Sequence, residues 1–161
     1  MALLFVVVLI AARKFDWIRR IGLSCLIPYL FLVFSVTVFL RSPSETANIN
    51  LEPFYSYKQY YLDDFTWFEI RANALLFIPI GILLPMVVRK PGLSLLIGVC
   101  ISVTIELLQF LLHRGLCETD DVISNSIGLF TGYCIFLIIK AVVFVIKKLV
   151  KYFQTRHNKA H

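Results

Sequence analysis

Residues 21–40 contain no charged side chain, and this stretch constrains the fold more than any other part of the chain. As a helix it would be about 30 Å long, which matches the hydrocarbon core of a bilayer. Residues 93–112 and 122–140 form similar apolar runs, in which the only charged residues are Glu106 and, at the end, Lys140. With 59% hydrophobic and 16% charged residues, the chain lacks the polar surface of a soluble domain. The sequence therefore predicts an integral membrane protein.

We expect an all-α fold with about five transmembrane helices. A short apolar run opens the chain, and snorkelling of Arg13 and Lys14 toward the membrane surface would extend it to Ile18. Basic residues follow this run, whereas they precede the apolar part of a signal peptide, so we interpret it as a short or tilted helix. A half-inserted or surface-lying helix is the alternative. The predicted helices cover residues 2–18, 21–40, 65–88, 93–112 and 122–140.

Two short connections determine how the last three helices pair. Residues 89–92 read Arg-Lys-Pro-Gly, which is typical of a tight turn, and the connection over 113–121 is also short. Each connection would join its neighbours as an antiparallel hairpin, and we expect these two hairpins to form the core. Helix rise counted from the turns places Asn73 and Asn125 at the depth of Leu108.

The distribution of charge predicts the orientation in the membrane. Basic residues gather at one set of helix ends, and most acidic residues fall in the connections at the other. By the positive-inside rule the amino terminus is outside and the carboxyl terminus is cytoplasmic. The same pattern explains the net charge of +6 without a nucleic-acid partner.

We expect a single domain over 1–161, with a core over 50–140 and a basic cytoplasmic tail over 141–161. This tail either extends the last helix or lies along the inner surface.

Polar residues near the outer ends of the helices form the candidate site. A carboxylate in an apolar span is costly, so Glu106 is interpreted as part of a site. Gln109 shares its helix face, and Asn73 and Asn125 lie within one or two helical turns in depth. The candidate catalytic residues are Glu106, Asp121 and Arg114, and the candidate ligand-binding residues are Arg71, Asn73, Glu106, Gln109, Arg114, Asp120, Asp121 and Asn125.

Structural roles compete with this interpretation. Asn73 and Asn125 could simply hydrogen-bond across helices, and Asp121 could be the N-cap of the last helix. An arginine paired with Glu106 could be a structural ion pair, although such pairs contribute little to stability.

Small residues recur at intervals of four in the last helix, at Ser124, Gly128 and Gly132. This spacing is typical of a helix face that packs closely against another helix. We therefore predict a close helix contact there.

The sequence contains no familiar enzyme signature. It has no phosphate-binding loop, serine elbow or metal-ligand spacing, so we expect no cofactor and no metal. His113 fits no ligand pattern. Cys117 lies outside the apolar runs, and as a nucleophile it would need a nearby base.

Three pieces of sequence form an ordered pattern across residues 50–132. They read Asn50-Leu-Glu-Pro-Phe54, then Asn73-Ala-Leu-Leu-Phe-Ile-Pro-Ile-Gly81, then Glu106-x-x-Gln109 with Arg114 and Asp121-x-x-x-Asn125-x-x-Gly128-x-x-x-Gly132. Taken together, they resemble the VanZ-like membrane proteins. The resemblance implies a link to low-level resistance against teicoplanin-type glycopeptides.

Three functional hypotheses remain open. In the first, an outer-leaflet polar site binds an amphipathic lipid-linked wall precursor or a lipoglycopeptide antibiotic. In the second, the protein is an enzyme acting on a lipid or cell-wall precursor, with Glu106 as general acid or base and Arg71 or Arg114 holding an anionic group. The third is a purely structural or partner-binding role. Membrane lipids are expected partners in each case.

Overall fold

The computed structural model describes residues 17–41, 49–59, 64–114 and 117–157. Within these ranges the chain is mostly helical, which confirms the predicted all-α class. Most of the predicted first helix, over residues 2–18, lies outside the described residues. Its last two residues, Trp17 and Ile18, belong to the following helix.

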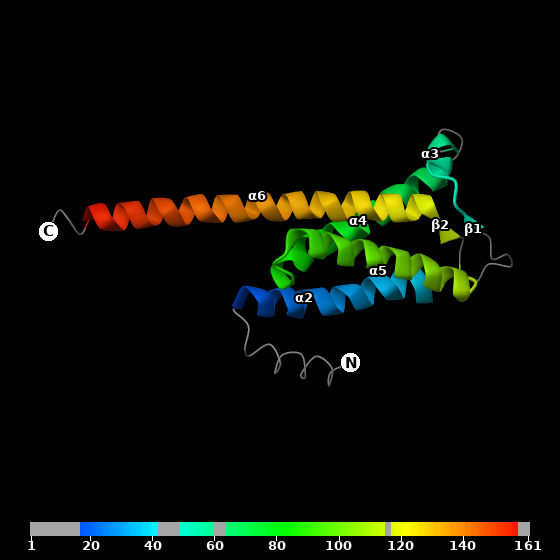
Figure 1. Ribbon diagram of the computed structural model, residues 1–161, viewed down its shortest axis with the longest axis horizontal. Helices are drawn as coiled ribbons and strands as arrows, with labels where there is room; N and C mark the ends of the chain where they lie inside the picture. The colour runs from blue at the N-terminus through cyan, green and yellow to red at the C-terminus, as the bar shows by residue number, and fades with distance from the viewer. Residues whose placement is uncertain (1–16, 42–48, 60–63, 115–116, 158–161) are drawn as a thin grey trace.

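Four of the described helices are long and apolar enough to cross a membrane, which supports a multi-pass membrane protein. They are α2 (Trp17–Phe34, prolonged by the π-helical turn η2, Ser35–Phe39), α4 (Asp64–Val87), α5 (Pro91–Leu111) and α6 (Thr119–His157). At one end of the bundle lie the short elements β1 (Ile49–Asn50), α3 (Tyr55–Gln59) and β2 (Cys117–Glu118) (Figure 1). The four long helices agree with the predicted spans to within a few residues at most ends.

The closest helix contact is between α4 and α6, which run in the same direction. A Cβ atom at Gly128 of α6 would overlap the backbone carbonyl of Ala74 in α4. One turn further along both helices, a Cβ atom at Gly132 would overlap the carbonyl of Ile78. Gly81 of α4 meets the α6 backbone in the same way. The predicted close packing of this small-residue face is therefore confirmed, and its partner is α4.

Helix α5 runs antiparallel to α6, and three pairs of residues define the register. In order along α5, Gly98 lies against Leu129, Ser102 accepts a hydrogen bond from Asn125, and Glu106 is close enough to Asp121 for their charges to interact. Each step of four residues along α5 is matched by a step of four back along α6, as helical periodicity requires. The polar residues of the two helices therefore face each other at successive turns.

This register differs from the depth that was counted from the turn. Asn125 was expected level with Leu108, but it pairs with Ser102, which is six residues or about 9 Å deeper along α5. The difference arises because the chain after α5 folds back alongside it. The backbone N–H of Glu118 already reaches Oε2 of Glu106, at 3.3 Å, before α6 begins.

Helix α2 packs on the other side of α4. The Tyr29 hydroxyl donates a hydrogen bond of 2.9 Å to the carbonyl of Leu76. Near the opposite end, Gly22 lies against Met86. The buried apolar core draws on all four helices and contains Leu26, Val33, Phe77, Ile80, Leu84, Ile105 and Leu129.

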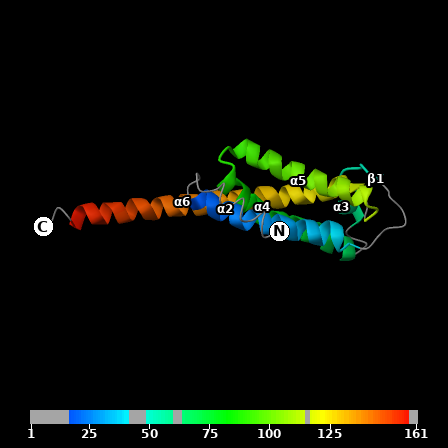
Figure 2. The same ribbon diagram turned by 90° about the horizontal axis from the view of Figure 1, so that it is seen from below.

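Helix α6 continues without a break well beyond the rest of the bundle (Figures 1 and 2). Its 39 residues correspond to about 58 Å of helix. The basic tail expected over 141–161 is thus a direct extension of the last helix as far as His157.

Candidate functional site

The end of α5 and the beginning of α6 lie beside the two short strands (Figure 1), and most of the candidate site residues belong to these segments. Strands β1 and β2 pair in parallel, with Asn50 opposite Glu118. This pairing brings the chain that follows α2 to the start of α6. Four carboxylates at this end act on one another electrostatically, and we call them the acidic cluster: Glu69, Glu106, Glu118 and Asp121.

Glu106 and Asp121 form the centre of the acidic cluster. Glu106 is 3% exposed and Asp121 is 9% exposed, although they come from different helices. Oε2 of Glu106 accepts the backbone N–H of Glu118, and the side chain of Asn73 hydrogen-bonds Asp121. Two buried carboxylates repel each other when both are ionised, so a shared proton or a nearby cation stabilises such a pair.

Arg41 provides a positive charge that acts on both Glu106 and Asp121. It lies two residues beyond the end of η2 and forms an ion pair with Glu69, with 3.3 Å between Nη2 and Oε1. Arg41 was not among the predicted site residues. The available signal was its position immediately after the uncharged run over 21–40, at the predicted outer surface.

Arg71, in contrast, does not join the acidic cluster. The residue is exposed, and its guanidinium lies over the Trp67 ring, 5.1 Å from the centroid. Residues two apart on a helix point in nearly opposite directions, so Arg71 cannot share a face with Asn73. Glu69 lies four residues before Asn73 and does share that face, a spacing that could have been used to find it.

Asp120 faces a different neighbour from Asp121. Its Oδ1 accepts the backbone N–H of Phe54 at 2.6 Å, and the residue is 2% exposed. One turn along α6, Ser124 Oγ donates to the carbonyl of Asp120 and lies 2.9 Å from the Tyr57 hydroxyl. Asp120 and Ser124 therefore dock the segment around α3 onto α6.

Gln109 faces η2, at the end of the first described span. Its Nε2 donates a hydrogen bond of 2.8 Å to the carbonyl of Thr37. Its Oε1 is buried too, and no donor from the described residues reaches it. A buried acceptor of this kind is normally satisfied by a water molecule or by a ligand.

The two asparagines both make interhelical hydrogen bonds. Nδ2 of Asn125 donates to Ser102 Oγ at 2.9 Å, deeper in the bundle than the acidic cluster. Asn73 bonds Asp121 and so contacts the acidic cluster itself. The structural role considered for these residues is therefore present, and only Asn73 combines it with a place beside the paired carboxylates.

Arg114 holds the backbone at the end of η2. Its Nη1 donates to the carbonyls of Phe39 and Arg41, each at 2.8 Å. The last carbonyls of a helix lack helical partners, and a basic side chain can satisfy them. Arg114 thereby positions Arg41, whose charge acts on Glu106.

His113 terminates α5 rather than joining the other site residues. Its φ of 52° lies in the left-handed region, and its N–H donates to the carbonyl of Phe110. The following N–H, of Arg114, reaches back to the carbonyl of Gln109 at 2.8 Å. These two bonds are typical of the Schellman motif at a helix carboxyl end.

Cys117 is in β2, between the helices. Burial, reinforced by the negative charge of Glu106, raises the pKa of its thiol. Because the thiolate is the nucleophilic form, these surroundings oppose a nucleophilic role for Cys117.

The model of one protein family, VanZ/LLP1, matches residues 23–140 of the chain. This range contains most of α2, all of α4 and α5, and the part of α6 that packs in the bundle. All four residues of the acidic cluster lie within it. Searches of curated proteins and of solved structures found no match.

Proposed function

This chain belongs to the VanZ/LLP1 family, and we propose that its acidic cluster binds an amphipathic ligand in the outer half of the membrane. The observation that carries the proposal is the meeting of Glu106 and Asp121, which are both buried and come from different helices. Two facing carboxylates do not stabilise a helix bundle by themselves. Buried carboxylates that face each other within a membrane protein are therefore candidates for a functional site.

The chemistry of the acidic cluster supports a ligand that supplies hydrogen-bond donors or positive charge. Arg41 is shared among several carboxylates, and Oε1 of Gln109 lacks a donor from the described residues. A lipid-linked wall precursor and a lipoglycopeptide antibiotic both combine a polar head rich in N–H and O–H groups with a hydrocarbon tail. Through such a ligand the protein would contribute to low-level resistance against teicoplanin-type glycopeptides.

Resistance is tested by expressing the chain in a teicoplanin-sensitive bacterial host. The wild type should raise the inhibitory concentration, and Asp121→Asn should abolish most of the increase at equal membrane abundance. Glu52→Gln is the matched control, because Glu52 is exposed and makes an ion pair with Lys58 outside the acidic cluster. Equal resistance from the wild type and Asp121→Asn would refute the proposal.

The proposed topology has five spans, with the amino terminus outside and the carboxyl terminus in the cytoplasm. Residues 2–18 would be the first span. The positive-inside rule supports this orientation, because Arg19, Arg20, Arg89 and Lys90 lie at the helix ends opposite the acidic cluster.

Cysteine labelling of intact cells tests the topology. In a variant whose native cysteines are replaced by serine, a cysteine at position 52 should react with a membrane-impermeant reagent. Cysteines at positions 90 and 148 should react only after the membrane is permeabilised. Reaction at position 90 in intact cells would reverse the orientation.

An enzyme is the second candidate, and the pairing of Glu106 with Asp121 is the observation that favours it. A pair of carboxyl groups that share a proton can serve as general acid and base. Glu106 would then transfer a proton to or from a lipid or cell-wall precursor. Turnover of such a precursor by the purified wild type, lost in Asp121→Asn, would favour catalysis, whereas binding without turnover would favour the first proposal.

A further inference from the structure

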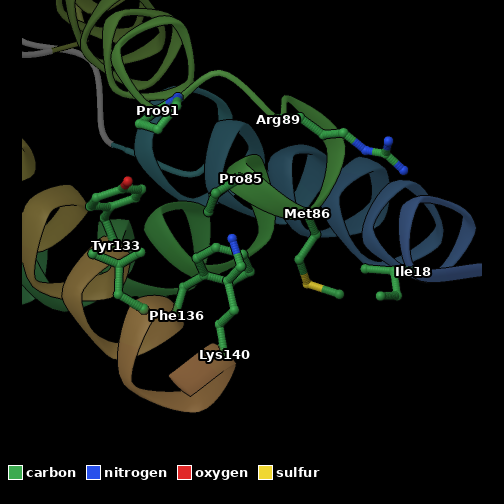
Figure 3. A pocket seen from close by; sticks show the side chains of 9 residues that line it. Ile18, Pro85, Met86, Arg89, Pro91, Tyr133, Phe136 and Lys140 are labelled. Carbon is green, nitrogen blue, oxygen red and sulfur yellow. The ribbon is translucent and has the colours of Figure 1, made fainter. Parts of the chain in front are cut away.

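We propose a second site at the opposite end of the bundle, where the chain binds the headgroup of an anionic phospholipid. A cavity of about 300 Å³ lies there between α2, α4 and α6 (Figure 3). Its polar lining residues are Arg89, Lys140 and Tyr133. The cavity shares no lining residue with the acidic cluster, so the two sites are independent.

The polar side chains are suited to a phosphate group. Figure 3 shows the Lys140 ammonium directed toward Pro85 and the Tyr133 hydroxyl directed toward Pro91. Arg89 lies two residues beyond the end of α4, and its guanidinium is directed away from Lys140 and Tyr133 (Figure 3). Ammonium and guanidinium groups bind phosphate oxygens through charge-assisted hydrogen bonds, and a phenol adds a neutral donor.

The beginning of α5 adds to this attraction. Pro91 is the first residue of the helix, and it also lines the cavity. The first N–H groups of a helix lack helical partners, and this end of the helix dipole favours anions. A phosphate in the cavity would therefore face the Lys140 ammonium and the Tyr133 hydroxyl, beside the positive end of a helix.

The apolar part of the lining indicates a lipid in preference to a soluble phosphate. Ile18, Met86 and Phe136 complete the wall, and they would contact the first part of an acyl chain. The cavity also lies at the level of the basic helix ends that include Arg19 and Arg20. Basic pockets between transmembrane helices are recurrent binding sites for anionic lipid headgroups.

The test uses the full-length protein purified in a neutral detergent. Dioleoyl phosphatidylglycerol should raise the unfolding temperature in a saturable manner, whereas dioleoyl phosphatidylcholine and free glycerol 3-phosphate should not. Lys140→Gln should weaken the apparent affinity for phosphatidylglycerol by about fivefold to tenfold. Tyr133→Phe, which keeps the ring, should weaken it by about threefold.

Lys148→Gln is the matched control, because it removes the same charge from the same helix outside the cavity. It should change the affinity less than about twofold. Equal stabilisation by phosphatidylcholine would refute the preference for an anionic headgroup. Equal stabilisation by glycerol 3-phosphate would refute the assignment of the ligand as a lipid. Unchanged affinity in Lys140→Gln, or an equal loss in Lys148→Gln, would overturn the cavity as the binding site.

Discussion

The backbone N–H of Phe54 donates a 2.6 Å hydrogen bond to Oδ1 of Asp120, which lies 66 residues later in the chain. This bond joins the segment before α3 to the first turn of α6. Phe54 adopts a left-handed backbone conformation, with φ of 64°. Asp120 therefore fixes the segment before α3 to α6, whereas the adjacent Asp121 belongs to the acidic cluster.

Asp120→Ala should lower the free energy of unfolding by about 1–3 kcal/mol, because it leaves the Phe54 N–H without its acceptor. Asp120→Asn keeps an acceptor oxygen and should lose less. Glu52→Ala in the same segment removes an exposed ion pair with Lys58 and should change stability by at most about 1 kcal/mol. Thermal unfolding in detergent measures all three, and equal stability of Asp120→Ala and the wild type would contradict the docking role.

Gly128→Leu should lower both the yield and the thermal stability. Even a Cβ atom at Gly128 would overlap the carbonyl of Ala74, so α4 and α6 must move apart. Overpacking of this kind costs about 1–3 kcal/mol or more. Gly92→Ala is the control, because nothing lies within 4 Å of a Cβ atom there. A stable Gly128→Leu protein would show that the two helices can separate at little cost.

Arg114→Lys should destabilise the protein almost as much as Arg114→Gln does. Nη1 of Arg114 bonds two carbonyls, those of Phe39 and Arg41, and the compact lysine ammonium does not reproduce the guanidinium geometry. We expect a loss of about 1–3 kcal/mol in the free energy of unfolding. Full stability of the lysine variant combined with weaker ligand binding would instead assign Arg114 to the ligand.

His113→Gly should stabilise the protein by about 1 kcal/mol, because glycine adopts the left-handed conformation without a steric penalty. Thermal unfolding measures the gain, and His113→Ala is the comparison that keeps the penalty. Loss of resistance in a more stable His113→Gly protein would reveal a functional role that its position at the end of α5 does not indicate.

The sequence predicted the helices because apolar length is a local property. It also placed Glu106 and Asp121 among the candidate site residues, but it did not predict that they meet. It did not predict which helices pack most closely. Gly128 and Gly132 mark a close contact, but the partner depends on the fold, and α4 was identified only from the structure.

The arginines show the same limit. The predicted depth in the membrane favoured Arg71 as a site residue, but depth does not specify a helix face. The Arg71 side chain points away from the acidic cluster, toward Trp67. Arg41 and Glu69 lie close together because the end of η2 meets α4, a contact between segments 28 residues apart. Local signals mark each of these two residues as a candidate, but their meeting depends on tertiary packing, which the sequence alone does not indicate.

The substitution Glu106→Gln distinguishes a ligand-binding role of Glu106 from a purely structural one. Glutamine keeps an acceptor for the Glu118 N–H and removes the repulsion between position 106 and Asp121, so stability should equal or exceed that of the wild type. Ligand affinity should fall by about tenfold or more if the ligand pairs with the charge, and resistance should fall with it. Thr104→Val, on the exposed face of the same helix, is the control and should retain both. Wild-type resistance from Glu106→Gln at matched membrane abundance would leave Glu106 with only a structural role.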